Sequence, residues 1–323
     1  VKLEKNIEAV EIYKKLSHLK PENAEIFYNY GISLCRLDKL NEALAAFSKA
    51  ISIRPEYPEA YNNIGKVLYS NGQIDLSSSF FQHAVKINPE YAEAHYNMGN
   101  IHLRRGDNAG AISSFNFAVK YQKEYAEAYN NLGSAYREHG FSHKALTCFE
   151  KAAELRPRSV EVFNNLGICY RDLGLLDLAK ESFEKAILIN PNSGETHRYL
   201  SSITTYKTED PHVRKMLDIL QSSVCSNTTC EINFALSKVY SDLKDVSTSF
   251  GYLSSGNAIR KKLLRYDIQQ DRILFNKIRE TNFKFKSFKL QPEESESDTV
   301  PIFILGMPRS GTTLVEQIIS AHG

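Results

Sequence analysis

Small and aromatic residues return to the same places in this chain every 34 residues. Glycine and phenylalanine columns run through five successive units, at Gly31, Gly65, Gly99, Gly133 and Gly167 and at Phe47, Phe81, Phe115, Phe149 and Phe183. Alanines at Ala50, Ala84, Ala118, Ala152 and Ala186 keep the same period, as do prolines at Pro21, Pro55, Pro89, Pro157 and Pro191. A fixed period of this length indicates a repeat architecture.

Each period predicts a helical hairpin. In the unit from 126 to 157, Tyr129, Leu132 and Tyr136 share one face of a first helix at helical spacing. Gly133 lies on that face, and its small size predicts that the second helix approaches closely there. Gly140 falls where the first helix should end, which suits a left-handed residue, and three other units have the same glycine: Gly72, Gly106 and Gly174. Because no hairpin covers its own apolar face, we expect neighbouring hairpins to stack into a solenoid.

The columns resemble those of the tetratricopeptide repeat (TPR), and the resemblance runs from Ala24 to Pro191. It implies a mainly α fold, a TPR α-solenoid with five full 34-residue repeats from residue 24 and a partial repeat before them. We therefore assign residues 1–193 to a TPR array. Since the chain begins with Val1 inside a repeat and stops soon after a predicted strand, we expect it to be truncated at both ends.

An asparagine recurs in the middle of every first helix, although asparagine is a poor helix former. The column consists of Asn29, Asn63, Asn97, Asn131 and Asn165. It resembles the asparagine ladder of the O-GlcNAc transferase TPRs, which implies a groove that holds a protein or peptide through its backbone. The alternative is that these amides bond backbone groups between adjacent helices. The TPR clamp for a C-terminal carboxylate uses lysines at the second repeat position, and this chain has glutamates there: Glu25, Glu59, Glu93, Glu127 and Glu161.

The 34-residue pattern fades after the fifth repeat. Residues 194–282 are predicted to be a degenerate, TPR-like helical spacer, in which Asp210-Pro211 begins a helix and residues 231–256 form one more hairpin. Residues 283–299 are predicted to be an acidic linker, because the stretch QPEESESDT from Gln291 to Thr299 has no apolar residue.

The last segment, residues 300–323, carries the candidate chemistry. Val300–Leu305 is predicted to be a buried strand, Gly306–Thr313 a loop, and Leu314–His322 a helix, so backbone N–H groups and a helix N-terminus converge on one anion site. The glycine spacing is that of a nucleotide triphosphate P-loop, but Thr312 occupies the position of its lysine. The nearest cation is Arg309, whose planar fork suits phosphate or sulfate oxygens.

The run from Arg309 to Leu314 resembles the 5′-phosphosulfate-binding loop of sulfotransferases and is similar to that of tyrosylprotein sulfotransferases. The order of TPR array, spacer and loop is similar to that of bacterial TPR-containing sulfotransferases. The resemblance implies that residues 300–323 begin an α/β P-loop-like sulfotransferase domain that uses 3′-phosphoadenosine 5′-phosphosulfate (PAPS) and no metal. It implies that Arg309 stabilises transition-state charge, and that the donor is held by five residues: Arg309, Ser310, Gly311, Thr312 and Thr313.

We therefore expect sulfuryl transfer from PAPS to a hydroxyl acceptor on a protein or peptide held by the TPR groove. The general base and the 3′-phosphate site of the resembled families follow this loop, so these 323 residues alone are expected to be inactive. One alternative is a non-catalytic TPR scaffold for protein–protein interaction. Another is a nucleotide triphosphatase, which would bind Mg·ATP through the loop.

Composition narrows the partners further. The formal net charge of +2 does not favour nucleic acid or a membrane surface as a partner, and the chain has no apolar run long enough to span a membrane. The five cysteines are odd in number and form no CxxC motif, so they are predicted to be buried free thiols in a reducing compartment. A cytoplasmic location is the corresponding expectation.

Overall fold

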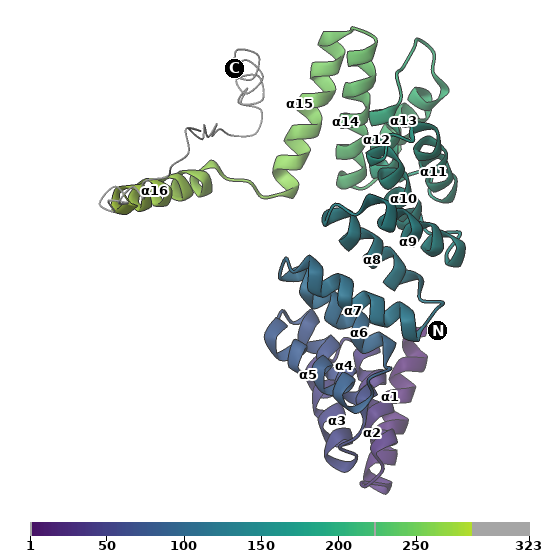
Figure 1. Cartoon of the computed structure of the whole chain (residues 1–323), viewed down its shortest axis with the longest axis vertical. Helices are drawn as coiled ribbons and strands as arrows, with labels where there is room; N and C mark the ends of the chain where they lie inside the picture. The colour runs from purple at the N-terminus through teal and green to yellow at the C-terminus, as the bar shows by residue number, and fades with distance from the viewer. Residues whose placement is uncertain (1, 223, 286–323) are drawn as a thin grey trace, which may run out of the picture. The chain divides into compact units, whose positions relative to one another are not determined.

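The computed structural model describes residues 2–222 and 224–285, and the regular elements within them are all α-helices. The predicted strand, loop and helix of residues 300–323 lie outside the described residues, as does most of the predicted acidic linker. The chain divides into two units, Val1–Arg265 and Tyr266–Gly323, and the repeats lie in the first. Figure 1 shows helices α1 to α15 following one another through this unit.

The five full repeats are five helical hairpins, as the sequence predicts, preceded by α1 (Lys2–Leu19). Their first helices are α2 (Ala24–Arg36), α4 (Pro58–Ser70), α6 (Ala92–Arg104), α8 (Ala126–Glu138) and α10 (Val160–Asp172). Their second helices are α3 (Leu40–Ile53), α5 (Ile74–Ile87), α7 (Asn108–Tyr121), α9 (Ser142–Leu155) and α11 (Leu176–Ile189). Each second helix packs against its own first helix and against the first helix of the next repeat, so the hairpins stack in chain order.

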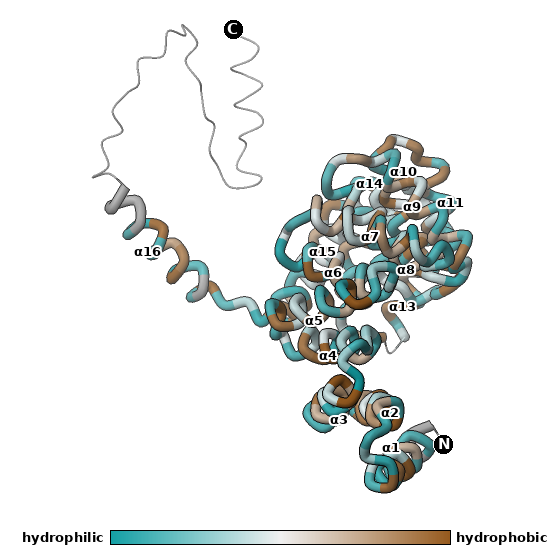
Figure 2. Tube along the Cα trace, turned by 60° about the horizontal axis from the view of Figure 1, so that its bottom comes forward, coloured by the Kyte–Doolittle hydropathy of each residue, from teal (hydrophilic) through white to brown (hydrophobic). Residues whose placement is uncertain are grey.

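The glycine and phenylalanine columns meet inside every hairpin. A Cβ atom placed on the glycine of the first helix would lie 2.5–2.8 Å from the nearest ring atom of the phenylalanine in the second helix. All five phenylalanines are fully buried. The close approach predicted from Gly133 is therefore confirmed, and it repeats at each glycine of the column. Figure 2 shows hydrophobic and hydrophilic residues mixed along each helix of the array, as expected for helices with one buried face.

The turns inside the hairpins use the left-handed conformation that the second glycine column predicts. Gly72, Gly106, Gly140 and Gly174 have φ between +74° and +85°. The first repeat has Asp38 at the equivalent place, with φ of 58°. Aspartate is among the few non-glycine residues that tolerate this region, so the first turn keeps its shape without glycine.

Four more helices complete the first unit: α12 (Gly194–Ile203), α13 (Pro211–Gln221), α14 (Ser226–Asp242) and α15 (Val246–Leu263). Asp210 caps α13 by accepting a hydrogen bond from the backbone N–H of His212 at 2.8 Å, as the Asp-Pro pair predicts. Helices α14 and α15 form the predicted hairpin, but its core contact is reversed. Leu253, which follows the turn residue Lys244 at the spacing by which Phe149 follows Gly140, is 40% exposed, whereas Phe234 of α14 packs against Gly256 of α15.

The described part of the second unit is one helix, α16 (Ile268–Phe285). Its apolar residues Ile273, Leu274 and Ile278 are each more than half exposed. Among the described residues, none of the helices combines the length and hydrophobicity that crossing a membrane requires.

Candidate functional site

The predicted donor residues Arg309, Ser310, Gly311, Thr312 and Thr313 lie outside the described residues, so the structure does not place them. The candidate site within the described part is the surface of the first helices that carries the asparagine column. We call it the first-helix groove and define it by the exposed faces of α2, α4, α6, α8 and α10 and the hollows between them.

The asparagines of the column link each first helix to the preceding one. The Nδ2 groups donate to the side chain 35 residues earlier: Asn63 to Tyr28 Oη at 3.0 Å, Asn97 to Asn62 Oδ1 at 2.8 Å, Asn131 to Tyr96 Oη at 3.1 Å, and Asn165 to Asn130 Oδ1 at 2.9 Å. The partners are therefore side chains, not the backbone groups of the alternative interpretation. Asn29 opens the column and has no such bond within the described residues.

The accepting side chains belong to a second column, which occupies the position immediately before each column asparagine. Its members are Tyr28, Asn62, Tyr96, Asn130 and Asn164, and the three asparagines among them are buried. Burial raises the pKa of Tyr28 and Tyr96, so both phenols stay protonated and neutral. The sequence signal of this column is a tyrosine or an asparagine immediately before every column asparagine.

Each bonded asparagine keeps an unused acceptor. Within the described part of the chain, the Oδ1 atoms of Asn63, Asn97, Asn131 and Asn165 accept no hydrogen bond. The side chains are partly exposed, so an incoming group can reach them. The Nδ2 group therefore fixes each side chain, through one bond in Asn63, Asn97 and Asn165 and through a second bond to Asn100 in Asn131, while the Oδ1 atom can accept a bond from a peptide N–H.

Two hollows lie beside these asparagines. The hollow between α2 and α4 has a volume of about 320 Å³, with the buried ring of Phe47 at its base and Arg36, Asn63 and Lys66 among its walls. The hollow between α4 and α6 measures about 240 Å³, and Phe81 takes the equivalent place. Lys66 lines both. Two successive repeats thus offer the same apolar base with polar walls, an arrangement typical of sites for small ligands or side chains.

The glutamates at the second repeat position are largely engaged by the scaffold itself. Glu93 pairs with Lys66 at 2.9 Å, Glu127 pairs with Arg156, and Glu161 accepts a hydrogen bond from Asn130 at 2.9 Å. The contacts of Glu93 and Glu161 join neighbouring repeats, and the Glu127–Arg156 pair lies within the fourth repeat, so this end of the first helices contributes mainly to the scaffold.

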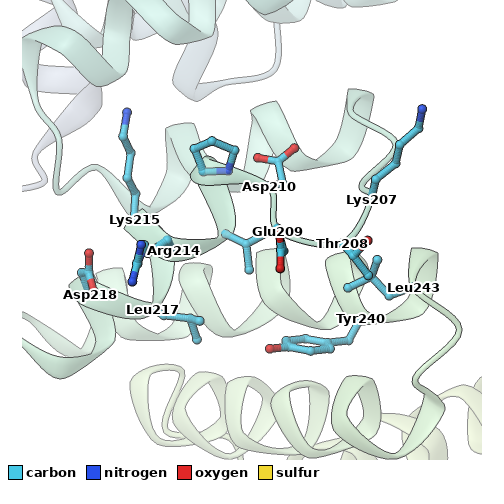
Figure 3. A pocket seen from close by; sticks show the side chains of 12 residues that line it. Lys207, Thr208, Glu209, Asp210, Arg214, Lys215, Leu217, Asp218, Tyr240 and Leu243 are labelled. Carbon is cyan, nitrogen blue, oxygen red and sulfur yellow. The ribbon is translucent and has the colours of Figure 1, made fainter.

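A larger hollow, of about 1020 Å³, lies at the end of the array between α13, the loop before it and the end of α14. Its apolar part consists of Val213, Leu217, Tyr240 and Leu243. In Figure 3, the amino groups of Lys207 and Lys215 lie on the opposite side of the hollow from Tyr240. The sequence analysis did not predict this hollow. Helix α13, the second helix of the sixth unit, has 11 residues and is shorter than the 14-residue second helices of the regular repeats.

A chain of buried hydrogen bonds connects α12 and α13. His197 Nε2 contacts the carbonyl oxygen of Pro191 at 2.8 Å, His197 Nδ1 contacts His212 Nε2 at 2.7 Å, and His212 Nδ1 contacts Tyr206 Oη at 2.6 Å. Two neutral imidazoles satisfy the chain when His197 Nε2 donates to the Pro191 carbonyl, His212 Nε2 donates to His197 Nδ1, and Tyr206 Oη donates to His212 Nδ1. Burial accordingly lowers the pKa of His197 and brings that of His212 down to about 4.

The cysteines follow the prediction of buried thiols except at one position. Cys148, Cys169 and Cys230 are buried and Cys35 is partly buried, and burial raises the pKa of Cys148 and Cys169 to about 11. Cys225 is exposed at the start of α14 because the loop before that helix faces solvent, so the prediction is wrong there.

Comparison with protein-family models gives two kinds of match. Models described as TPR repeat or tetratricopeptide repeat match residues 31–72, 58–91, 80–113, 99–140, 126–159 and 160–193. A model described as Sulfotransferase family matches residues 301–323, a short segment that contains the predicted donor loop.

One relative and two solved structures align with parts of this chain. An uncharacterized protein of Aquifex aeolicus (strain VF5) is 33% identical over 118 residues, which is 36% of this chain but only 15% of that protein. The Cut9–Hcn1 hetero-tetramer of APC/C aligns with 72% of this chain and 46% of its own, at 19% identity and a TM-score of 0.56. Pseudomonas aeruginosa pilF aligns with 68% of this chain and 97% of its own, at 20% identity and a TM-score of 0.50. Both structures share the fold.

Proposed function

This chain is a tetratricopeptide-repeat protein, and we propose that its array holds an extended peptide in the first-helix groove. The observation that carries the proposal is the unused Oδ1 atom on each bonded asparagine of the column. One such acceptor per repeat can meet backbone N–H groups of a peptide whatever its sequence. Because the scaffold already fixes these side chains through Nδ2, binding costs little of their rotamer entropy.

The two hollows support the same proposal. They lie between successive first helices, and each is lined by an asparagine of the column, Asn63 in one and Asn97 in the other. A peptide whose backbone follows the asparagines can place side chains into these hollows, above Phe47 and Phe81. The backbone contacts then contribute general affinity, and the hollows contribute selectivity.

The column itself supplies a matched test. Asn97→Ala removes both the acceptor and a bond between helices, whereas Asn29→Ala removes an acceptor that bonds no neighbouring side chain. Peptides selected from a random library on the chain are titrated by fluorescence anisotropy. We expect each variant to bind about three- to tenfold more weakly, and only Asn97→Ala to melt at a lower temperature. If both variants bound peptides normally, the column would serve the scaffold alone.

We propose further that the protein is a sulfotransferase that moves the sulfuryl group of PAPS to a hydroxyl of the peptide in the groove. Support comes from the Sulfotransferase family match over residues 301–323 and from the residues that this segment contains. Arg309 would bind oxyanion oxygens bidentately and stabilise the charge that develops on them. Backbone N–H groups from Ser310 to Thr313 would hold the 5′-phosphosulfate of the donor, together with the hydroxyls of Ser310, Thr312 and Thr313.

Transfer of ³⁵S from PAPS by the full-length protein tests this second proposal. We expect labelled peptide, a loss of at least about a hundredfold in rate with Arg309→Ala, and little effect of Asn29→Ala on labelling of a small alcohol. A protein that binds groove peptides but neither binds nor uses PAPS would be the non-catalytic scaffold. Mg·ATP binding that improves with Thr312→Lys would instead favour the triphosphatase.

A further inference from the structure

The two hollows of the first-helix groove share a phenylalanine base but differ in their walls. The first hollow, between α2 and α4, has four apolar wall residues: Ile32, Cys35, Leu40 and Val67. The first three of these are partly exposed, so an entering group can touch them. The wall residues of the second hollow, between α4 and α6, all carry a polar group: Lys66, Tyr69, Asn97 and Asn100. Within the described residues, the first hollow therefore offers apolar surface that the second does not.

The residue at one repeat position follows the difference in size between the two hollows. Cys35 lies four residues after Gly31, and Tyr69 lies four residues after Gly65, so the two are equivalent. The hollow beside the cysteine measures about 320 Å³, and the hollow beside the tyrosine about 240 Å³. The equivalent residues of the other three repeats are also larger than cysteine: Leu103, Arg137 and Arg171. Cysteine thus leaves open in the first repeat the space that a larger side chain takes in the second.

Charge around the first hollow disfavours a basic side chain. The described lining residues include two cations, Arg36 and Lys66, and no carboxylate. Lys66 pairs with Glu93 at 2.9 Å, whereas Arg36 forms no ion pair within the described residues. A charged side chain of either sign would lose water against the apolar walls, and a basic one would also meet the charge of Arg36. The hollow therefore favours an uncharged group.

We propose that the first hollow anchors the groove peptide by taking one large apolar side chain, such as phenylalanine, leucine or methionine. This inference rests on the proposed peptide-binding function and adds the chemistry of the partner and the repeat that recognises it. Asn63 lines the same hollow, and its Oδ1 atom accepts no hydrogen bond within the described residues. A backbone N–H of the peptide beside the anchor can bond to Asn63 while the apolar side chain covers Ile32 and Leu40.

Cys35 sets the size of the side chain that this anchor site accepts. Burial raises the pKa of its thiol, so at neutral pH Cys35 is a small, uncharged wall residue. A tyrosine in its place should fill the hollow. The fold accommodates a tyrosine there, since Tyr69 occupies the equivalent position one repeat later. Cys35→Tyr is therefore a substitution that removes the site and keeps the scaffold.

Labelled peptides of alternating serine and alanine test the inference by fluorescence anisotropy. They differ only at the central residue, which is phenylalanine, leucine, alanine, glutamine or lysine. The native chain is compared with Cys35→Tyr, with the reverse substitution Tyr69→Cys as the matched control, and with Asn29→Ala, which addresses the backbone contacts. Thermal melting verifies that each variant folds.

We expect the phenylalanine and leucine peptides to bind at least about tenfold more tightly than the other three, because the anchor buries apolar area. Cys35→Tyr should remove this advantage, Tyr69→Cys should keep it, and Asn29→Ala should weaken all peptides alike. An advantage that persisted in Cys35→Tyr would overturn the inference. If all five peptides bound equally and Asn29→Ala weakened them, the anchor site would be wrong and the groove function would stand. If none of the peptides bound, both would fail.

The reactivity of Cys35 gives a second measurement, which needs no substitution at the site. Iodoacetamide modifies the native chain with and without the phenylalanine peptide, and mass spectrometry follows Cys35 and, as an internal control, the exposed Cys225 at the start of α14. At about ten times its Kd, the phenylalanine peptide should slow modification of Cys35 about tenfold and leave Cys225 unchanged. An unchanged rate at Cys35 would show that the peptide binds elsewhere and would overturn the inference.

Discussion

The regular repeats, residues 24–193, and the end of the array, residues 194–263, build the same kind of hairpin from different contacts. In the regular repeats a fully buried phenylalanine meets a glycine once per hairpin, and polar links between repeats lie along the groove. At the end of the array, ionised groups take part in the packing. Glu231 of α14 is 7% exposed and accepts hydrogen bonds from Arg198 of α12 at 2.7 Å and Arg260 of α15 at 2.6 Å.

This difference explains why only one region repeats. A glycine–phenylalanine contact lies within one hairpin and can be copied in the next. The Glu231 cluster joins three particular helices, and Phe234 lies between its two arginines, with both guanidinium carbons 5.3–5.4 Å from the ring. Such a contact fixes one arrangement at the end of the array. The regular region, in contrast, leaves the Oδ1 atoms of Asn63, Asn97, Asn131 and Asn165 without a hydrogen bond within the described residues.

Alanine substitutions in the phenylalanine column should give the largest difference in unfolding free energy between the two regions. Phe115→Ala empties a fully buried position and should cost about 3–5 kcal/mol of unfolding free energy. Leu253→Ala, at the equivalent place of the last hairpin, should cost less than about 1 kcal/mol because Leu253 is 40% exposed. Urea unfolding followed by circular dichroism measures both. Equal losses would contradict the reversed core contact.

Glu231 should be the most sensitive polar residue at the end of the array. Glu231→Gln removes the charge shared by Arg198 and Arg260, and we expect a loss of about 2 kcal/mol, since both arginines still reach solvent. Glu161→Gln, an exposed glutamate of a regular repeat, serves as the control and should change stability by less than about 0.5 kcal/mol. If Glu231→Gln left the free energy of unfolding unchanged, the cluster would not hold the three helices together.

The histidine pair should make the end of the array sensitive to acid. The folded state lowers the pKa of His212 to about 4, below the ordinary value of 6.5, so the unfolded chain binds the proton more readily. Above pH 6.5 protonation of His212 does not reduce the free energy of unfolding. As the pH falls from 6.5 towards 4 the unfolded chain takes up the proton first, and the free energy of unfolding decreases by about 2 kcal/mol between pH 7 and pH 5. The pH dependence of the unfolding free energy of the native chain and of His212→Gln measures it. An unchanged slope in the variant would show that other groups are responsible.

The glycines of the two regions should respond differently to alanine. At Gly99, the new Cβ would lie 2.5 Å from Phe115, so the clash exceeds the gain in helix propensity and the net loss should be about 1–2 kcal/mol. At Gly256, the nearest ring atom of Phe234 is 3.0 Å away, and we expect a net effect within about 0.5 kcal/mol. Thermal unfolding measures the stability of the two variants. A larger loss for Gly256→Ala than for Gly99→Ala would contradict the account of the core contacts.

The sequence predicted the regular region well because its packing is local and periodic. Gly133 and Phe149 lie in one hairpin, so their spacing alone indicates the contact. Phe234 and Gly256 have no counterpart in the columns, and the partners of Glu231 come from helices about 30 residues away on either side, so no pattern could reveal them. At the candidate site, the asparagine column was visible in the sequence. Its Nδ2 partners depend on the stacking of consecutive repeats, which only the structure supplies.

Hydrogen–deuterium exchange of the whole chain, with and without a peptide selected on it from the random library, tests the central claim most directly. The account predicts slower exchange in α2, α4 and α6, which carry Asn29, Asn63 and Asn97, and no change in α14 and α15. Slower exchange confined to residues 207–218 and 240–243, around the hollow at the end of the array, would contradict it. So would unchanged exchange in the first three repeats at a saturating concentration of the peptide.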